Sequence, residues 1–409
     1  MSEWKKVKLG EICERVTSGG TPKANVSSYY NPPTIPWLKT KEVNYCRITE
    51  TENYISEEGL KNSSAKLISP NSVIIAMYGQ GDTAGRIAIN KIPLATNQAC
   101  CNLTIDKSKA DYEFIYYQLC TLYDKLVSLK AGAAQPNLNA RIIKNLEIIM
   151  PSLPIQHRIA SILSRYDSLI ENYQKQIKLL EEAAQRLYKE WFIDLHFPGH
   201  ENTNIIDGVP EGWEKKTIDD VTCKITTGLN PRKNFVLGKG SNYYVTIKNM
   251  ADNTLFLDDR CDRVDNEALE KINKRSDLKI GDILFSGIGT IGRVALVDKP
   301  TNNWNVSESV FTLRANDIVT KEFLYLMLLS PDMQNYCQSN AHGAAQKGIR
   351  MADLKAYSFN LPPFGVIQKF TNLVTPTIKK VSSIRNQIRL LTEARDRLLP
   401  KLMSGEIAV

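Results

Sequence analysis

The sequence lacks any run of about 18 uncharged apolar residues, which is the length a helix needs to cross a bilayer. Hydrophobic residues make up 43% of the chain and charged residues 23%, a balance typical of globular proteins that excludes intrinsic disorder. The opening residues, MSEWKKVKLGEICERV, have neither the apolar run nor the small-residue cleavage site of a signal peptide. These absences predict a cytoplasmic protein that has no membrane partner.

Motifs for metals and for ATP are also missing. The eight cysteines include no Cys-X-X-Cys pair, so no zinc site is predicted. There is no GxxxxGK(S/T) loop for ATP and no clustered set of Asp, Glu and Lys typical of a nuclease. His196 and His200 are four residues apart, but Pro198 between them breaks the helix that would bring both rings to one face. We therefore predict no catalytic residue and no metal ligand.

Two short motifs resemble cofactor sites without their surroundings. Gly287-Ile-Gly-Thr-Ile-Gly292 has the spacing of a dinucleotide-binding turn, but the residues from Arg293 onward indicate a strand, so no helix N-terminus can hold a pyrophosphate. Asn31-Pro-Pro-Thr34 ends in Thr where amino-methyltransferases have an aromatic residue, and no glycine-rich S-adenosylmethionine turn precedes it. The chain thus lacks the parts to cut, methylate or translocate by itself.

Length and charge favour a multidomain protein with a polyanionic partner. Single domains usually hold about 100 to 200 residues, and this chain has 409. Its 52 Lys and Arg residues against 44 Asp and Glu residues give a net charge of +8, with a pI of 8.9. Such a balance suits a nucleic acid, although many proteins without that partner share it.

An internal repeat decides the architecture. The segment that begins at Trp4 and ends at Gly19 returns from Trp213 to Gly228, with the same pattern of aromatic, apolar, hydroxyl and glycine positions at an offset of 209. Further matches predict a strand, a glycine turn and a second strand, followed by a short helix, in each half. They pair Val73–Gly79 with Ile283–Gly289, Gly85–Ala88 with Gly292–Ala295, Glu113–Tyr116 with Glu322–Tyr325, and Gly132-Ala-Ala-Gln135 with Gly343-Ala-Ala-Gln346.

Each half ends in a long helical segment whose apolar residues alternate spacings of three and four. This is the a/d spacing of a coiled coil, and it predicts that the two helices pack on each other. The alternative is that each apolar stripe docks its helix on its own domain. The predicted seam residues are Ile170, Tyr173, Ile177, Leu180 and Leu187 in the first helix, and Ile384, Ile388, Leu391 and Leu398 in the second.

Loops between the repeated anchors carry side chains that could read a nucleic acid. Guanidinium, ammonium and carboxamide groups pair with guanine or adenine edges and with phosphates. The alternative for each one is a solvated surface side chain, and Arg86 and Arg293 have a structural alternative because both halves share an arginine there. The predicted DNA-binding residues are Lys39, Lys41, Gln80, Arg86, Gln98, Lys248, Asn249, Arg293, Gln346, Lys347 and Arg350.

Taken together, these features resemble the specificity subunits of Type I restriction-modification enzymes along essentially the whole chain. No single piece is diagnostic, but their order, occurring twice, is specific. The matching pieces are the two openings, the strand–glycine–strand turns, the Gly-Ala-Ala-Gln segments, Pro151–Gln156 with Leu361–Gln368, and the helix endings Leu187–Asp194 and Leu398–Gly405.

The resemblance implies an α/β (α+β) fold with two homologous mixed α/β target recognition domains, separated by two long helices that form an antiparallel coiled coil. Two small departures, Arg395 where the first copy has Ala184 and Pro400 near the chain end, affect only the end of the second helix. The expected parts are a first recognition domain (1–155), a first spacer helix (156–197), a linker (198–212), a second recognition domain (213–366) and a second spacer helix (367–405).

The resemblance also implies partners. The chain would read double-stranded DNA with a bipartite target and bind two methyltransferase (M) subunits, joined by two restriction (R) subunits. No cofactor would bind this chain, because S-adenosylmethionine, ATP and Mg²⁺ would belong to those partners. Tyr188 and Phe192, which flank the first seam, are expected to face a partner subunit. The alternatives are a coiled-coil scaffold protein and a self-contained DNA methyltransferase or nuclease with a cryptic site.

Overall fold

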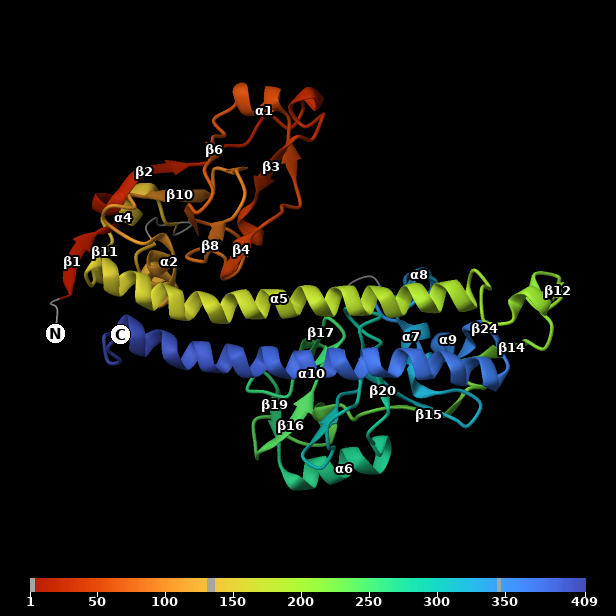
Figure 1. Ribbon diagram of the computed structural model, residues 1–409. Helices are drawn as coiled ribbons and strands as arrows, with labels where there is room; N and C mark the ends of the chain where they lie inside the picture. The colour runs from red at the N-terminus through yellow and green to blue at the C-terminus, as the bar shows by residue number, and fades with distance from the viewer. Residues whose placement is uncertain (1–3, 131–136, 344–346) are drawn as a thin grey trace. The chain divides into compact units, whose positions relative to one another are not determined.

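The computed structural model describes residues 4–130, 137–343 and 347–409, which form two compact units. The first unit contains Met1–Glu171 and Arg389–Val409, and the second contains Asn172–Ile388. Two long helices, α5 (Leu153–Phe192) and α10 (Phe364–Met403), have residues in both units. Figure 1 labels both helices.

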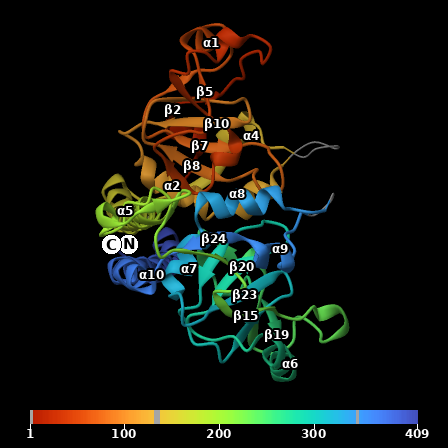
Figure 2. The same cartoon turned by 90° about the vertical axis from the view of Figure 1, so that its right-hand side faces the viewer.

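A five-stranded sheet of order β2-β10-β7-β8-β4 forms the centre of the first unit. Figure 2 labels four of these strands, β2, β10, β7 and β8. Neighbouring strands are antiparallel, except that β4 runs parallel to β8. Strands β7 and β8, rich in Ile, Val and Ala, are buried along their whole length, as expected for central strands. The strands are β2 (Cys13–Ser18), β10 (Cys100–Ile105), β7 (Val73–Ala76), β8 (Ile87–Asn90) and β4 (Cys46–Ile48).

The first unit also contains a four-stranded sheet of order β5-β3-β9-β6, in which β3 and β9 are parallel. A separate antiparallel pair, β1 with β11, joins the start of the domain to its end. These strands are β5 (Tyr54–Ile55), β3 (Ile35–Leu38), β9 (Leu94–Thr96), β6 (Leu67–Ile68), β1 (Lys5–Lys8) and β11 (Glu147–Met150). The short helices are α1 (Glu57–Lys61), α2 (Tyr112–Cys120), α3 (Tyr123–Ser128) and α4 (Ala140–Lys144).

The second unit repeats this plan. Its four-stranded sheet, β15-β23-β20-β21, corresponds to β2-β10-β7-β8, and its parallel pair β16–β22 corresponds to β3–β9. The predicted strand–turn–strand repeat and the mixed α/β class are therefore confirmed. The main strands are β14 (Glu214–Thr217), β15 (Thr222–Thr227), β16 (Asn242–Val245), β19 (Asp262–Val264), β20 (Ile283–Ser286), β21 (Val294–Leu296), β22 (Trp304–Val306), β23 (Val310–Ala315) and β24 (Ser358–Leu361). The helices are α6 (Asn266–Ser276), α7 (Lys321–Leu328), α8 (Pro331–Ser339) and α9 (Met351–Ala356). Two small antiparallel hairpins complete the unit. One pairs β12 (Ile205–Ile206) with β13 (Val209–Pro210), and the other pairs β17 (Met250–Ala251) with β18 (Thr254–Leu255).

Helices α5 (Leu153–Phe192) and α10 (Phe364–Met403) contain 40 residues each and pack together. In the first unit Asp167 of α5 pairs with Arg395 of α10 at 2.7 Å, and in the second unit Glu181 pairs with Arg385 at 2.6 Å. Partner numbers fall along α10 as they rise along α5. The two helices are therefore antiparallel.

Both helices begin earlier than the predicted residues 156 and 367. Pro154 lies in the first turn of α5, where its missing amide hydrogen would have no helical partner. Helix α5 ends at Phe192 rather than near residue 197, and Leu195 just beyond has a positive φ of 63°. Helix α10 continues through Pro400 to Met403. The other domain bounds remain predictions.

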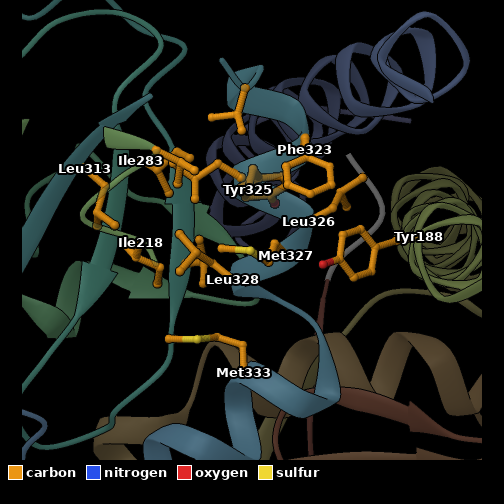
Figure 3. Close-up of a cluster of buried hydrophobic side chains, with 14 of the residues drawn as sticks. Tyr188, Ile218, Ile283, Leu313, Phe323, Tyr325, Leu326, Met327, Leu328 and Met333 are labelled. Carbon is orange, nitrogen blue, oxygen red and sulfur yellow. The ribbon is translucent and has the colours of Figure 1, made fainter. Parts of the chain in front are cut away.

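The predicted seam residues differ in burial. Ile170 is 8% exposed and Ile384 is fully buried, whereas the others are partly buried. Their assignment to contacts between the helices remains a prediction. The expectation that Tyr188 and Phe192 face a partner subunit is wrong, because both are buried in the aromatic core of the second unit, against Phe323 and Phe370. Figure 3 shows Tyr188 beside this buried cluster, which includes Phe323. Heptad spacing does not reveal that the core of the second unit covers these flanking positions.

Candidate nucleic-acid interface

Loops at the ends of the strands of the first unit meet at one edge. Strands β3 and β9 are parallel, so Lys39 and Asn97 follow them side by side, and the Asn97 amide donates to the Leu38 carbonyl at 2.9 Å. The Gly20 amide, just after β2, donates to the Thr96 carbonyl at 2.9 Å. The backbone amide of the residue that follows β7 donates to the backbone carbonyl of the residue that precedes β10, at 2.7 Å. These loops, called the first edge, are residues 19–21, 39, 77–80 and 97–99.

The second unit builds an equivalent edge, in which two of these three backbone hydrogen bonds recur. The Ser307 amide donates to the Val245 carbonyl at 2.8 Å, as Asn97 does to Leu38, whereas the glycine turn is bonded differently, with the Gly228 amide donating to the Ser307 carbonyl at 3.2 Å. The backbone amide of the residue that follows β20 donates to the backbone carbonyl of the residue that precedes β23, at 3.0 Å, as at the equivalent positions of the first edge. These loops, called the second edge, are residues 228–230, 246, 287–289 and 307–309.

Side-chain hydrogen bonds also match between the edges, although the residue types differ. In the first edge the Thr21 hydroxyl donates to the Gln98 carboxamide oxygen. At the same positions of the second edge, Nδ2 of Asn230 donates to Oε1 of Glu308 at 2.8 Å. A buried aromatic residue supports each loop: the Trp37 indole nitrogen donates to the Gly20 carbonyl at 3.0 Å, as the Tyr244 hydroxyl does to the Leu229 carbonyl at 2.7 Å.

Three of the predicted DNA-binding residues of the first unit lie on the first edge. Gln80 and Gln98 are exposed, and Lys39 is partly buried, with its Nζ 2.9 Å from Oδ1 of Asn53. Outside the edge, Lys41 is exposed and pairs with Glu52 at 2.5 Å, and Arg86 pairs with Asp82 at 2.5 Å. All five remain proposed contacts.

In the second unit, three predicted residues are exposed. Lys248 follows β16 in a short 3-10 helix, Ile247–Asn249. Lys347 is next to the second edge, because its carbonyl accepts from the Gly289 amide at 2.8 Å, and Arg350 precedes α9. These three remain proposed contacts. Gln346 lies outside the described residues.

Two predicted contacts have structural roles instead. Asn249 is 2% exposed, and its Oδ1 accepts from the Thr246 amide at 2.9 Å, which caps the 3-10 helix as Glu42 does in the first unit. Arg293 donates through Nη1 to the carbonyls of Ile247 and Met250, at 2.9 and 2.5 Å. The structural alternative therefore applies to Arg293, and neither residue is proposed as a DNA contact.

Sequence reasoning missed Thr21, Asn230 and Glu308. Thr21 and Asn230 each follow the repeated glycine by two residues, and Glu308 aligns with Gln98 two residues before β23 and β10, respectively. The repeat contained this signal, but the prediction was drawn from side-chain chemistry rather than from equivalent positions, and so it left out a hydroxyl, a carboxamide and a carboxylate at these positions.

Arg293→Ala is expected to lower the free energy of unfolding of the second unit by about 2 kcal/mol, because two backbone carbonyls lose a charged donor. Arg86→Ala, at the same repeat position, is the matched control and should change stability little, since Asp82 is exposed. Denaturant unfolding of the full chain, with hydrogen exchange at residues 247–255, measures both. Equal effects of the two variants would contradict these roles.

The chemistry of the described residues does not indicate a nucleophile or metal site. Across residues 4–130, 137–343 and 347–409, no three His, Cys, Asp or Glu side chains are grouped to hold a metal ion. The described cysteines are free, and burial raises the pKa of the Cys101 thiol to about 12, which disfavours the reactive thiolate. Among the described helices, none is both long and apolar enough to cross a membrane.

A buried ionic cluster links the first recognition domain to both long helices. Asp167 of α5 is 2.9 Å from the Arg47 guanidinium of β4, 2.5 Å from the Tyr117 hydroxyl of α2 and 2.7 Å from the Arg395 guanidinium of α10. Burial acts to raise the pKa of Asp167, but hydrogen bonds from Tyr117 and Arg395 and the charge of Arg47 outweigh it and lower the pKa. The cluster therefore fixes an ionised carboxylate where four elements meet.

The second unit has a comparable but more exposed contact. Nη2 of Arg385 in α10 lies 2.6 Å from Glu181 of α5 and donates to the Asp252 carbonyl at 2.8 Å. Asp252 and Asn253 form the two-residue turn between β17 and β18, and their φ angles of 47° and 53° are those of a type I′ hairpin. Nδ2 of Asn253 also donates to Glu181 at 3.3 Å. The β17–β18 hairpin of the second domain thus forms hydrogen bonds with both α5 and α10.

Known proteins share this organisation. The family model described as the type I restriction modification DNA specificity domain matches residues 1–182 and again residues 210–388. The type I restriction enzyme MjaIX specificity subunit of Methanocaldococcus jannaschii is 28% identical, with 100% of this chain and 94% of that protein covered. The HindI specificity subunit of Haemophilus influenzae is 22% identical, with 100% of both chains covered.

A crystal structure of the type I restriction-modification S subunit from M. genitalium superposes with a TM-score of 0.62 at 17% identity, covering 98% of this chain and 96% of that one. The likeness shows that the fold is shared. Two matched domains, relatives aligned over their full length and a common fold lead to one conclusion: the chain belongs to the type I restriction-modification DNA specificity family.

Proposed function

We propose that this non-catalytic DNA specificity subunit reads a bipartite target, with one half-site for each recognition domain, 1–155 and 213–366. The observation that carries the proposal is the pair of edges, which share two backbone hydrogen bonds and one side-chain hydrogen bond at equivalent positions while presenting different side chains. Two edges with a similar backbone arrangement but different side chains are suited to recognising two half-sites of different sequence. The scaffold and self-contained enzyme alternatives gain no support from the related proteins.

The proposed contacts form two groups, one that binds phosphates and one that binds base edges. Exposed lysine and arginine side chains would hold phosphates, and the net charge of +8 favours that approach. Glutamine side chains on the first edge would pair with base edges. The proposed contacts are Lys39, Lys41, Gln80, Arg86, Gln98, Lys248, Lys347 and Arg350.

The subunit acts within a multisubunit complex that binds DNA. We propose that it assembles with two methyltransferase and two restriction subunits, and that S-adenosylmethionine, ATP and Mg²⁺ bind those partners. The exposed apolar side chains Leu179 and Leu390 are available on the long helices, at 65% and 50% exposure, whereas Tyr188 and Phe192 are not.

Mapping methylated adenines genome-wide, in cells with and without this gene, tests the function. We expect a split motif, methylated on both strands, that disappears when the gene is deleted. The control is the deletion strain carrying the gene on a plasmid, which should restore the motif. An identical set of methylated sites in both strains would contradict a role in DNA specificity.

Exchange of one domain tests the independence of the readers. Replacing residues 20–130 with the equivalent segment of a relative, while keeping Arg47 and Tyr117, should change one half of the methylated motif and leave the other half intact. The physical reason is that each edge forms its hydrogen bonds within its own unit. Methylome sequencing of the chimera measures the outcome, and a change in both halves would contradict independent reading.

A further inference from the structure

The two edges differ in charge at one equivalent position. Gln98 and Glu308 each lie two residues before the strand that follows, and each accepts a hydrogen bond from the residue two positions after the repeated glycine. Gln98 is exposed and Glu308 is partly buried. The equivalent position of the two edges thus carries a carboxamide in the first unit and a carboxylate in the second.

The hydrogen bonds within each edge determine which groups remain available. Oε1 of Gln98 accepts from Thr21, which leaves the two amino hydrogens of Gln98 to donate. Oε1 of Glu308 accepts from Asn230 at 2.8 Å, and Oε2 lies 3.1 Å from the Tyr244 hydroxyl. A carboxylate has about four acceptor sites, so lone pairs remain on Glu308 for another donor. The first position can still donate, while the second can only accept.

Neighbouring groups hold Glu308 in place, and two cationic residues follow one of these groups in the sequence. Burial, followed by the charge of Glu308, raises the pKa of Tyr244, so its hydroxyl stays protonated beside the carboxylate. Arg232 and Lys233 are exposed just after Asn230, and Lys23 occupies the repeat position of Arg232 in the first unit. Each unit therefore has an exposed cation, suited to a phosphate, two positions after the residue that donates to Gln98 or Glu308.

We propose that Glu308 determines specificity in the second half-site by accepting a hydrogen bond from the exocyclic amino group of cytosine or adenine. In the major groove only these two bases present an amino donor, and carboxylates pair with the amino group of cytosine. The inference rests on the proposed function. A fixed carboxylate weakens attraction to phosphates, so its removal relaxes base choice without weakening attachment to DNA.

The test is the methylated motif of the full complex carrying Glu308→Gln. Gln retains an acceptor for Asn230 but adds amino donors, so one cytosine or adenine position of the second half-site should lose its preference by about 10-fold or more. The first half-site should stay unchanged. Glu267→Gln is the matched control, because Glu267 is an exposed carboxylate of the same unit that pairs with Lys271 on α6. This control should leave the whole motif unchanged.

The reciprocal variant, Gln98→Glu, decides the case if Glu308→Gln abolishes methylation. It should impose a preference for an amino-bearing base at one position of the first half-site. Active Glu308→Gln complexes with an unchanged motif would overturn the inference, as would Gln98→Glu complexes without a new preference. The wild-type motif separates the two proposals: its absence refutes the proposed function, whereas its presence with an unaltered variant refutes only the role of Glu308.

Discussion

Asp167→Ala is expected to lower the free energy of unfolding of the first unit by about 3 kcal/mol, the largest stability change that we predict for a single residue. Removing one partner of a buried ion pair costs about 3 to 5 kcal/mol, because the remaining charge stays desolvated. The low end applies here, since Glu171 remains 3.4 Å from Arg47. Denaturant unfolding of the full chain, with hydrogen exchange to locate the weakened segments, provides the measurement.

The control is Glu147→Ala, which removes an exposed partner of Lys6 in the same unit and should change stability little. The pH dependence gives a second readout with Asp167→Asn. The pKa of Asp167 is below its ordinary value of 3.8, so its stabilising contribution is complete above that pH and is lost as the pH falls through the lower, folded-state value. Wild-type stability should therefore fall more steeply below pH 3.8 than that of the variant. Parallel pH profiles would contradict the ionised cluster.

Insertion of seven residues into α5 alone is expected to abolish site-specific methylation, because the paired helices would no longer match in length. Seven residues inserted after Ile177 and seven after Ile388 should instead restore activity with a spacer longer by about three base pairs. Helix rise is about 1.5 Å per residue, and DNA advances about 3.4 Å per base pair. Both insertion points lie between the two interhelical ion pairs along each helix, so both pairs are retained.

Selection from DNA libraries with randomised spacers measures the new spacing. The added base pairs also turn the duplex by roughly a quarter turn or more, which should weaken binding of the double insertion. Three heptads in each helix would add about nine base pairs, close to the roughly 10 to 10.5 of a full turn, and should recover affinity. An active double insertion with the original spacer would show that the helices do not set the distance between half-sites.

The sequence predicted those elements whose signal lies within a short stretch of chain. The glycine turns at Gly85 and Gly292 have positive φ angles of 93° and 87° between paired strands, as the matched segments indicated. Both long helices followed from their spacing of three and four. Repetition of the openings also predicted two equivalent domains.

Features that depend on residues far apart in the sequence could not be predicted from local patterns. Arg293 differs from Arg86 only in which neighbours lie within reach, and those neighbours are more than 40 positions away in sequence. Asp167 meets Arg47 and Arg395 through three separate elements. Burial of Tyr188 likewise depends on Phe323 and Phe370, which helical spacing alone cannot place nearby.

The Asp167 cluster also constrains how the gene can change by recombination. A crossover that imports a new first domain brings that domain's own residues at positions 47 and 117, while Asp167 and Arg395 stay with the helices. An imported domain without a cation at position 47 leaves Asp167 with one guanidinium in a buried setting, at a cost in folding free energy. New DNA specificities therefore arise at the lowest cost in stability from foreign domains whose charge matches the recipient helices, whatever bases those domains read.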